Sequence, residues 1–474
     1  MARRSNALVL ADLTYLGDAA CMCDEACVMR RIAVLAFLVI LMAGVAFSLA
    51  FTAPQPREGK LAPPRIAAVV VAASGEKPPY KIPILNPMQL SRMNPLLTRA
   101  KLVVFTSKAA SETPKQLVEK LLDEGKALLV LSRHPCRTLL GKLAPGPAAP
   151  LTLLPLATRT EAGLNVHAEA MLIEARPVGG KLIPHYVVYA YKPSLGEVLK
   201  EVTARTGRQL PTKPIDLADF GTNIAMFLDR WEPVGTFKYI KILKVPFFGE
   251  SVPIGRAQIE LWFYYDLDSE NKTILPQLAR WLIIAYQHIS VFSNVSDEVS
   301  LPAHILGGWN NDPEMLKLNI TRWPDELIED YSPFGTGEGP VKISVSLNVV
   351  AGTQPQVGAS VTFTISDGIY YETRDVTLGS RYFREIGGAR DARVSWLWGN
   401  KALSDVKDAE FTGWSYIDAP VYVPPSLYTS RPPGLFMEVD ARNVLATLIG
   451  LTTVDDAFSQ MFYVWKTFSM SIGS

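Results

Sequence analysis

Two residues that could do nucleophilic chemistry, His134 and Cys136, stand in the stretch SRHPC directly after an apolar run. A thiolate is a strong nucleophile, and a neighbouring cation lowers the pKa of a thiol. Two residues apart on an extended chain, these side chains would point the same way with Cα atoms roughly 6 to 7 Å apart. Pro135 reshapes the turn between them. The sequence therefore favours a structural thiol, with catalysis by Cys136 assisted by His134 as the alternative.

Oxygen donors at alternate positions, Asp266, Asp268 and Glu270, resemble the spacing of a calcium-binding loop. The EF-hand pattern also requires Gly at its sixth position and Glu at its twelfth, where this chain has Asn271 and Gln277. A solvated turn is the favoured interpretation and calcium binding is the alternative. The chain contains no phosphate-binding loop, zinc-protease motif or nucleophile elbow. We therefore expect no cofactor, and the sequence leans away from an enzyme.

Three acceptor sequons for N-glycosylation, at Asn271, Asn294 and Asn319, lie within some fifty residues of one another. These asparagines can be glycosylated only if this part of the chain leaves the cytoplasm. Acidic and basic residues nearly cancel, with a formal charge of +1, and no block of like charge indicates nucleic acid as a partner. We expect surface positions for the three asparagines and a glycan on at least one.

The apolar stretch from Ile32 to Phe51 contains no charged residue and is long enough to cross a bilayer. Arg30 and Arg31 precede it, which places the N-terminus in the cytoplasm and the bulk of the chain outside. The alternative is a cleaved signal peptide, with Ser48-Leu49-Ala50 as the cleavage site and a start at Met22 or Met29. In both cases the chain after Gln55 is exported. The lipid bilayer, contacted through residues 32–53, is the expected membrane partner.

Cysteine usage agrees with an exported fold that needs no disulfide. Cys21, Cys23 and Cys27 precede the apolar stretch, so Cys136 is the one cysteine in the exported part. Metal binding, palmitoylation and an unstructured reduced tail are the three interpretations of the N-terminal cluster.

Strand and helix patterns position His134 and Cys136 at the end of a parallel sheet. Apolar runs at 65–71, 101–105 and 127–131 predict buried strands, and a helix with Thr113 as N-cap and Gly125 after its end lies between the last two. Over residues 65–140 this arrangement resembles an amidotransferase-like or flavodoxin-like layer. The resemblance implies a cysteine in a Gly-x-Cys-x-Gly elbow, but neither glycine is present around Cys136.

Further along the chain, the pattern predicts a hairpin around residues 177–180, helices after Ser194 and Asp216, and a helix over 275–288. From Val341, alternating apolar and polar residues predict antiparallel strands, and an aromatic stripe over 454–468 predicts a final helix.

These features predict a mixed α+β fold: one N-terminal transmembrane helix, a membrane-proximal α/β (βαβ) domain, a middle α+β region and a C-terminal antiparallel β-rich domain. The expected boundaries are a cytoplasmic tail (1–28), a signal-anchor (29–53), a Pro-rich linker (54–64), the α/β domain (65–210), the α+β region (211–335), and the β-rich domain with its C-terminal helix (341–474). The favoured function is a membrane-anchored structural or interaction protein that contacts protein partners or itself outside the cell. An exported hydrolase or transferase with a site near His134 and Cys136 is the alternative.

Overall fold

The computed structural model describes part of the chain: residues 67–91, 95–133, 153–156, 168–178, 181–203, 231–247, 250–267, 278–292, 309–311, 314–319, 327–339, 341–346, 360–365, 369–377, 392–400, 408–420, 434–447 and 453–465. All of them belong to one compact unit, Ile66–Ser474. The predicted membrane segment, 32–53, and the N-terminal cysteines lie outside the described residues. Within the described ranges, no helix has the length and apolar character needed to cross a membrane.

The first strands form a parallel sheet, as predicted. Strands β1 (Ala67–Val71), β3 (Ala100–Thr106), β4 (Ala127–Leu131) and the short β2 (Ile84–Leu85) lie in the order β2-β1-β3-β4 and pair in parallel. Their valines and leucines are buried on both faces of the sheet, which explains the continuous apolar runs in the sequence. The helices between them are α2 (Pro87–Ser91), α3 (Pro95–Arg99), α4 (Ser107–Glu112) and α5 (Lys115–Asp123).

Helix α5 ends where the sequence predicted but begins differently. Gly125 adopts a φ of +71°, and its N–H donates to the Leu122 carbonyl. The N–H of Lys126 donates to the Leu121 carbonyl, which completes a Schellman motif. At the other end, Pro114 is the N-cap, and Thr113 Oγ1 instead donates to the Ala109 carbonyl of α4 at 2.7 Å. The predicted N-cap at Thr113 is therefore wrong, because the Thr113 hydroxyl bonds to the preceding helix α4.

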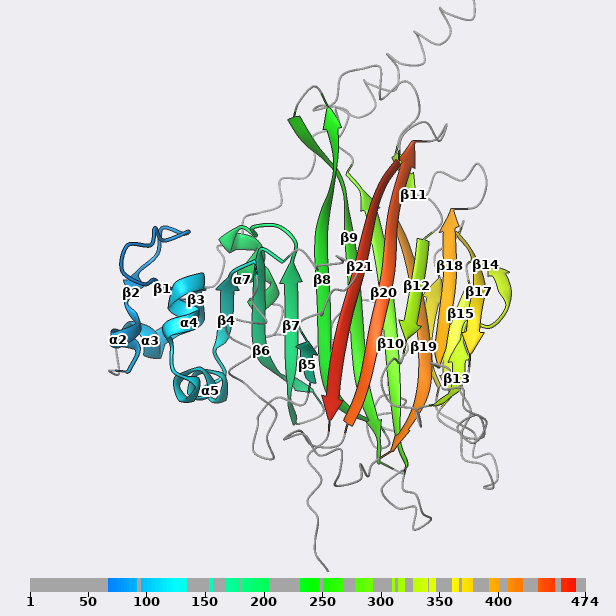
Figure 1. Ribbon diagram of the computed structural model, residues 1–474, viewed down its shortest axis with the longest axis horizontal. Helices are drawn as coiled ribbons and strands as arrows, with labels where there is room; N and C mark the ends of the chain where they lie inside the picture. Colours follow the sequence, from blue (N-terminus) through cyan, green and yellow to red (C-terminus); the bar gives the residue numbers. More distant parts are fainter. Residues whose placement is uncertain are drawn as a thin grey trace, which may run out of the picture. The chain divides into compact units, whose positions relative to one another are not determined.

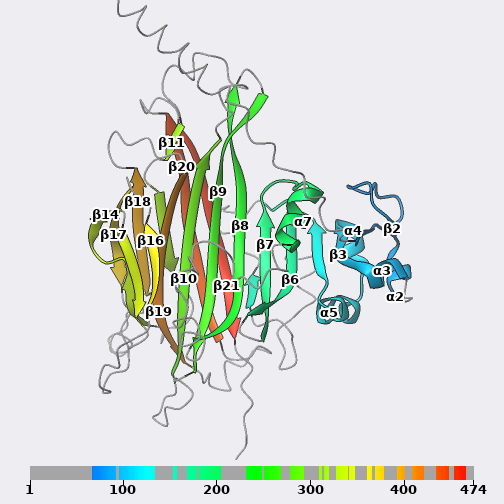
Figure 2. The same ribbon diagram turned by 180° about the vertical axis from the view of Figure 1, so that it is seen from behind.

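The parallel strands continue into a large mixed sheet, which we call sheet A (Figures 1 and 2). Its order among the described strands is β13-β19-β10-β9-β8-β7-β6-β4-β3-β1-β2. The hairpin β6–β7 was predicted, and β7 then pairs in parallel with β8. Helix α7 (Leu195–Thr203) follows β7 and packs Val198 and Val202 against the sheet. The added strands are β6 (Ala170–Val178), β7 (Lys181–Tyr189), β8 (Trp231–Phe247), β9 (Glu250–Asp266), β10 (Leu278–Val291), β13 (Leu327–Ser332) and β19 (Asp408–Pro420).

A second, antiparallel sheet, which we call sheet B, has the order β14-β17-β18-β12-β20-β21-β5, with β11 also pairing β20. In Figure 1 its strands β20 and β21 lie in front of β8–β10, and Figure 2 shows β8–β10 in front from behind. The strands are β5 (Leu153–Leu156), β11 (Trp309–Asn311), β12 (Glu314–Asn319), β14 (Thr336–Glu338), β17 (Ile369–Thr377), β18 (Arg393–Asn400), β20 (Gly434–Thr447) and β21 (Thr453–Trp465). Strands β15 (Val341–Ser346) and β16 (Ser360–Ile365) form a separate antiparallel pair.

Aromatic rings fill the space between the two sheets. Phe462 of β21 lies with its ring centroid 4.8 Å from that of Phe237 in β8 and 5.3 Å from that of Phe263 in β9. The ring centroid of Phe458, four residues earlier on the same face of β21, lies 4.8 Å from that of Tyr239. Such tilted and edge-on pairs contribute about 0.5–1.5 kcal/mol each beyond their buried area. The two sheets therefore share one apolar core, as the layers of a sandwich do.

A chain of buried polar side chains also joins the sheets. The indole N–H of Trp398 in β18 donates to Gln287 Oε1 of β10 at 2.9 Å. Gln287 Nε2 donates to Asn443 Oδ1 of β20 at 2.9 Å, and Asn443 Nδ2 reaches Asp456 Oδ2 of β21 at 3.5 Å. Asp456 also forms an ion pair with Lys241 of β8. Buried polar groups of this kind are tolerated only when they are satisfied, so the chain fixes one alignment of sheet A on sheet B.

The structure corrects the predicted fold class. The protein is mostly β, and strands of sheet A come from all three of the predicted regions that follow the linker. The segment predicted as a helix over 275–288 is strand β10, and the predicted final helix over 454–468 is strand β21. Both strands are buried on both faces, so the alternation that identifies a strand is absent from them. The antiparallel strands predicted after Val341 are confirmed, and the short strand β14 precedes them.

Candidate functional site

A cleft of about 560 Å³ lies where the carboxyl ends of β1, β3, β4 and β7 meet at one edge of sheet A. Open α/β sheets bind ligands at this edge. The lining residues come from five separate segments: Glu76, Lys77, Pro79, Thr106, Ser107, Leu131, Ser132, Arg133, Glu169 and Lys192. The volume lies in the range of sites that hold small molecules.

Glu76 is fixed at the cleft by the turn after β1. The N–H of Glu76 donates to the Ala73 carbonyl, and Gly75 adopts a φ of +85°, which the third position of a type II turn requires. Glu76 Oε2 accepts from the Ala73 N–H at 3.0 Å and from the Thr106 hydroxyl, and Oε1 accepts from the Lys108 N–H at 3.2 Å. Partial burial would raise the pKa of Glu76, but these hydrogen bonds hold it below its ordinary value. Glu76 is therefore an ionised, already satisfied carboxylate.

Two hydroxyls lie at the ends of neighbouring strands. Ser107, which begins α4 directly after β3, donates from Oγ to Ser132 Oγ at 3.3 Å, just beyond the end of β4. Ser132 is buried and Ser107 is exposed. Because Ser107 is exposed and lines the cleft, its hydroxyl is accessible to a polar ligand.

Three cations surround the cleft. Arg133 Nε lies 3.6 Å from Glu169 Oε1; the Arg133 side chain is largely in solvent and that of Glu169 nearly half exposed. Among the described residues, Lys77 and Lys192 form no hydrogen bond or ion pair with another side chain. The Tyr80 hydroxyl donates to the Pro193 carbonyl at 2.8 Å and so joins the loop of Lys77 to the segment of Lys192.

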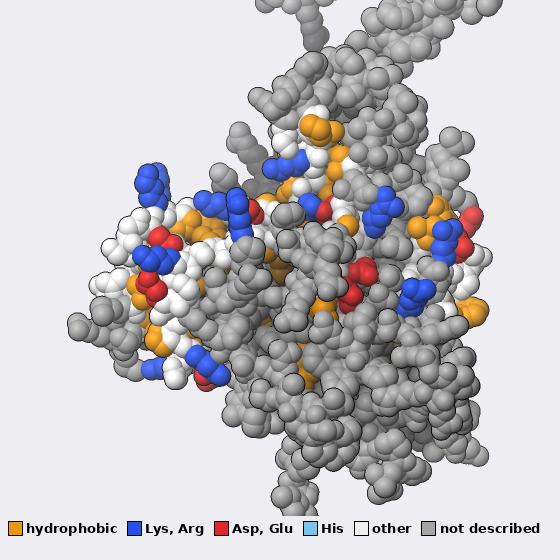
Figure 3. All heavy atoms as spheres, in the orientation of Figure 1, with side chains coloured by type: hydrophobic (Ala, Val, Ile, Leu, Met, Phe, Trp, Pro, Cys, Tyr) orange, Lys and Arg blue, Asp and Glu red, His pale blue; other side chains and the backbone are white. Residues whose placement is uncertain are grey.

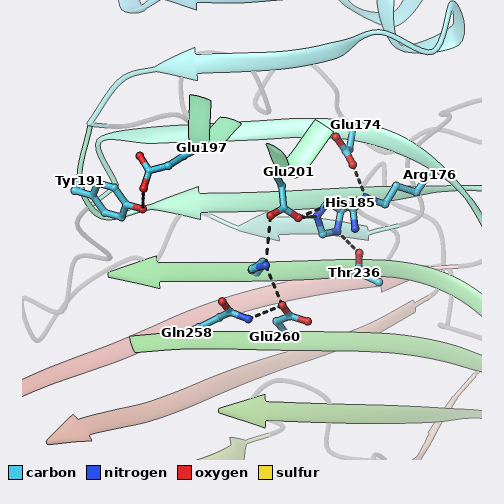
Figure 4. Close-up of polar contacts among 10 residues, drawn as sticks. Glu174, Arg176, His185, Tyr191, Glu197, Glu201, Thr236, Gln258 and Glu260 are labelled. Carbon is cyan, nitrogen blue, oxygen red and sulfur yellow. Dashed lines mark hydrogen bonds and ion pairs between the residues drawn. The ribbon is translucent and has the colours of Figure 1, made fainter. Parts of the chain in front are cut away.

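Helix α7 is held on the sheet next to the cleft by a second constellation, drawn in Figure 4. Its start is capped reciprocally: the Glu197 N–H donates to Ser194 Oγ, and the Ser194 N–H donates to Glu197 Oε2. This confirms the predicted cap at Ser194. One turn later Glu201 turns its carboxylate toward strands β6, β7 and β8 (Figure 4).

The Glu201 carboxylate contacts three basic side chains. Arg176 Nη2 donates to Glu201 Oε1 at 2.9 Å, Lys238 Nζ lies 3.4 Å from Oε2, and His185 Nε2 lies 3.6 Å from Oε1. Lys238 also pairs with Glu260 Oε1 at 3.1 Å. Burial would raise the pKa of Glu201, but the contact with His185 and the two cations hold it well below its ordinary value.

His185 is neutral in this environment. Burial, followed by the charge of Arg176, lowers the pKa of His185 to about 3. Its Nδ1 shares a hydrogen bond with Thr236 Oγ1, while Nε2 faces the Glu201 carboxylate. The carboxylate favours the tautomer with hydrogen on Nε2, so the Thr236 hydroxyl donates to Nδ1.

Thr236, His185 and Glu201 thus stand in the order hydroxyl, imidazole, carboxylate that nucleophilic enzymes use. Thr236 is only 7% exposed, and the cavity beside it measures about 10 Å³. This is room for about one water molecule and not for a substrate. The constellation is therefore a buried charge cluster that anchors α7.

The residues singled out from the sequence are only partly described. His134, Cys136, Asp268, Glu270, Asn271 and Asn294 lie outside the described residues. Asp266 ends β9, is buried, and lies 3.9 Å from Arg280, which also pairs with Asp418 at 3.2 Å. Within the described ranges, no group of three or more His, Cys, Asp or Glu side chains is arranged to hold a metal ion. Asn319 is the last residue of β12, whose backbone pairs with both β18 and β20.

Sequence reasoning missed most of the cleft residues. Ser132 and Arg133 belong to the stretch SRHPC that the sequence singles out, whereas no motif marks Glu76, Ser107 or Lys192. Each follows an apolar strand by a few residues, and that position was the available signal. On the face shown in Figure 3, basic and acidic side chains are interspersed over the part of the molecule that holds α4 and α5.

No protein-family model and no curated protein matches this chain. Three solved structures overlap about half of it: Clostridium perfringens delta-toxin (11% identity, 48% of this chain, 90% of that chain, TM-score 0.26), a pore forming protein (10%, 49%, 90%, 0.24), and the Clostridium perfringens NetB toxin in the membrane inserted form (8%, 48%, 91%, 0.18). Similarities this weak assign neither fold nor function to the chain.

Proposed function

We propose that this protein is a membrane-tethered binding protein that holds its β-rich unit outside the cytoplasm and takes a small polar ligand into the cleft at the edge of sheet A. The observation that carries the proposal is the convergence of four strand ends on a cleft of about 560 Å³ lined by hydroxyls and charged groups. Ser107 is exposed at the cleft, and Lys77 and Lys192 form no ion pair with a described acidic side chain, so these three side chains are available to a ligand.

Ligand binding is tested by thermal unfolding of the full chain in a neutral detergent, with a library of small sugars, amino acids, organic acids and phosphates. We expect at least one compound class to raise the melting temperature. Ser107→Trp, which fills the cleft from an exposed position, should abolish the shift. Ser111→Trp, on the same helix but outside the cleft lining, should retain it. A library without effect, or an undiminished shift in Ser107→Trp, would reject the proposal.

The extracytoplasmic location rests on the apolar stretch at 32–51 and the arginines before it. Protease added to intact cells should digest the region after Gln55 and spare a tag placed at the N-terminus. Digestion of the tag with survival of the β-rich unit would reverse the orientation.

One observation keeps an exported hydrolase or transferase as the second candidate. Ser132 and Arg133 line the cleft, and His134 and Cys136 follow them directly in the sequence. The measurement is the rate at which iodoacetamide labels Cys136 in the folded protein as the pH is varied. Slow labelling without an inflection below about pH 8 indicates an ordinary or inaccessible thiol. Rapid labelling at pH 6 that is lost in His134→Ala would favour the enzyme.

A further inference from the structure

We infer that the cleft binds a small soluble molecule through an anionic group, a phosphate or a carboxylate, which Lys77, Arg133 and Lys192 contact. The inference rests on the proposed binding function and specifies its ligand class. It rests on the charged side chains that line the cleft among the described residues.

The three cations come from three different loops. Lys77 follows β1, Arg133 follows β4 and Lys192 follows β7. All three are exposed at the cleft. For Lys77 and Lys192, no described acidic side chain lies within ion-pair distance. Arg133 has a planar guanidinium whose parallel N–H groups match the two oxygens of a carboxylate or phosphate.

The two carboxylates of the lining do not cancel these cations. Glu76 already accepts three hydrogen bonds, two of them from backbone N–H groups that lie next to its charge. Glu169 approaches Arg133 only to 3.6 Å and keeps nearly half of its side-chain surface in solvent. Since an exposed pair of this kind contributes little, an anionic ligand displaces Glu169 from Arg133 at small cost.

The volume of the cleft and its neutral hydrogen-bond donors restrict the class of ligand further. The volume of about 560 Å³ exceeds what a single inorganic anion fills, so the ligand carries an organic part. The exposed Ser107 supplies a hydroxyl for its polar groups. A cationic ligand would meet three positive side chains and a Glu76 carboxylate whose oxygens already accept hydrogen bonds.

The experiment is isothermal titration calorimetry of the full chain in a neutral detergent with ribose phosphate, glycerol phosphate, citrate and a neutral polyol of similar size. We expect one of the three anions to bind and the polyol not to bind. Arg133→Glu and Lys192→Glu should each weaken the binding by about tenfold or more, because reversal of one contacting charge costs at least about that factor. Raising the salt concentration should also weaken the binding of the anion by the original protein.

A charge-matched control separates site binding from a change in net charge. Lys101→Glu makes the same change at an exposed position of β3, away from the cleft lining, and should bind as the original protein does. Equal weakening by Lys101→Glu would overturn the inference. Folding of each variant is checked by its unchanged unfolding midpoint without ligand; both cleft substitutions are at exposed loop positions, so they leave the core intact.

The remaining outcomes show whether the anion is soluble or part of a lipid. They also show whether only the anionic class is wrong or the binding function as well. Binding to vesicles of an anionic phospholipid that Arg133→Glu abolishes, without binding of any soluble anion, would place the anion on a lipid headgroup and overturn the soluble ligand. Binding of the neutral polyol or of a cationic compound instead of the anions would reject the anionic class and leave the binding function standing. If no compound of either library binds, both the anionic ligand and the proposed binding function are rejected.

Discussion

At Glu201 one carboxylate contacts side chains of three successive strands, Arg176 of β6, His185 of β7 and Lys238 of β8. Arg176 also pairs with Glu174, and Lys238 with Glu260. Buried ions are stable only as a compensated set, since removal of one member leaves the others desolvated without a partner. The attachment of α7 to the sheet therefore depends on the Glu201 side chain.

Glu201→Gln should reduce the free energy of unfolding by about 3–5 kcal/mol, because it leaves Arg176 and Lys238 buried with less compensating charge. Urea denaturation followed by circular dichroism measures the change. Glu112→Gln, which breaks an exposed pair with Lys108 at 3.9 Å, is the control and should cost less than about 1 kcal/mol. Similar costs for the two variants would mean that the cluster in Figure 4 does not anchor α7.

His185 should make the protein less stable in acid. Its pKa is lowered to about 3 in the folded protein, whereas an unfolded histidine has a pKa near 6.5. Between these values the unfolded state binds more protons, so the free energy of unfolding falls as the pH falls from about 6.5 toward 3. The same denaturation series at pH 7, 6 and 5 should show this slope and a smaller one in His185→Gln, whose amide does not titrate. An identical slope in both proteins would show that His185 is not the group responsible.

At the scale of elements, the helices are delimited by local devices that the sequence displays. The Schellman motif at Gly125 ends α5, and the reciprocal cap between Ser194 and Glu197 starts α7. These contacts join residues three to five apart, so they form without the rest of the fold. This is why the sequence predicted them, and why their energies can be tested one residue at a time.

Gly125→Ala should destabilise the protein by about 1 kcal/mol, because a φ of +71° costs a residue with a Cβ roughly this amount. No atom lies within 4 Å of the added Cβ, so the effect reports the backbone alone. Gly196→Ala is the matched control inside α7: its φ is not positive, and the new Cβ would meet only Ser194 Oγ at 3.9 Å. It should be neutral or stabilising by up to about 1 kcal/mol. Thermal unfolding of both variants decides, and equal destabilisation would contradict the assignment.

At the scale of the whole molecule, sheets A and B are aligned by the polar chain through Gln287 as well as by their aromatic core. Gln287 is fully buried and satisfies the Trp398 indole, the Arg442 carbonyl and the Asn443 amide oxygen. These three groups belong to β18 and β20 of sheet B, so a single side chain of sheet A connects two strands of the opposite sheet.

Gln287→Leu should lower the free energy of unfolding by about 2–4 kcal/mol, since it removes the hydrogen-bond partner that Gln287 gives to the buried Trp398 indole N–H and to Asn443 Oδ1. Gln89→Leu, at an exposed position of α2, should change it by less than about 0.5 kcal/mol. Chemical denaturation followed by circular dichroism measures both changes. A loss below 1 kcal/mol for Gln287→Leu would mean that the aromatic core alone holds the sheets together.

The sequence predicted the parts of this molecule that local signals specify. The parallel strands around Val103 and Leu129, the β6–β7 hairpin and the cap at Ser194 were all anticipated. Strands β10 and β21 were mistaken for helices, because a strand buried on both faces has no polar face and Phe458, Met461 and Phe462 match helical spacing by coincidence.

The candidate site was predictable to a lesser degree. Ser132 and Arg133 follow a recognisable apolar strand, but Glu76, Ser107 and Lys192 come together only through the order of strands in sheet A. That order depends on pairings between distant segments, which no local pattern specifies.

The pairing of β5 with β21 has a consequence for how the chain reaches this structure. Leu153 of β5 is in register with Val464 of β21, so two segments some 300 residues apart must meet before sheet B closes at that edge. Folding of contacts this remote is slow, and strand edges left unpaired in the meantime are prone to aggregate. A nascent chain cannot complete sheet B until β21 has been synthesised and, if the unit is exported, translocated. We therefore expect refolding after dilution from denaturant to be slow, concentration-sensitive and dependent on a chaperone that keeps β5 and β20 apart from other chains.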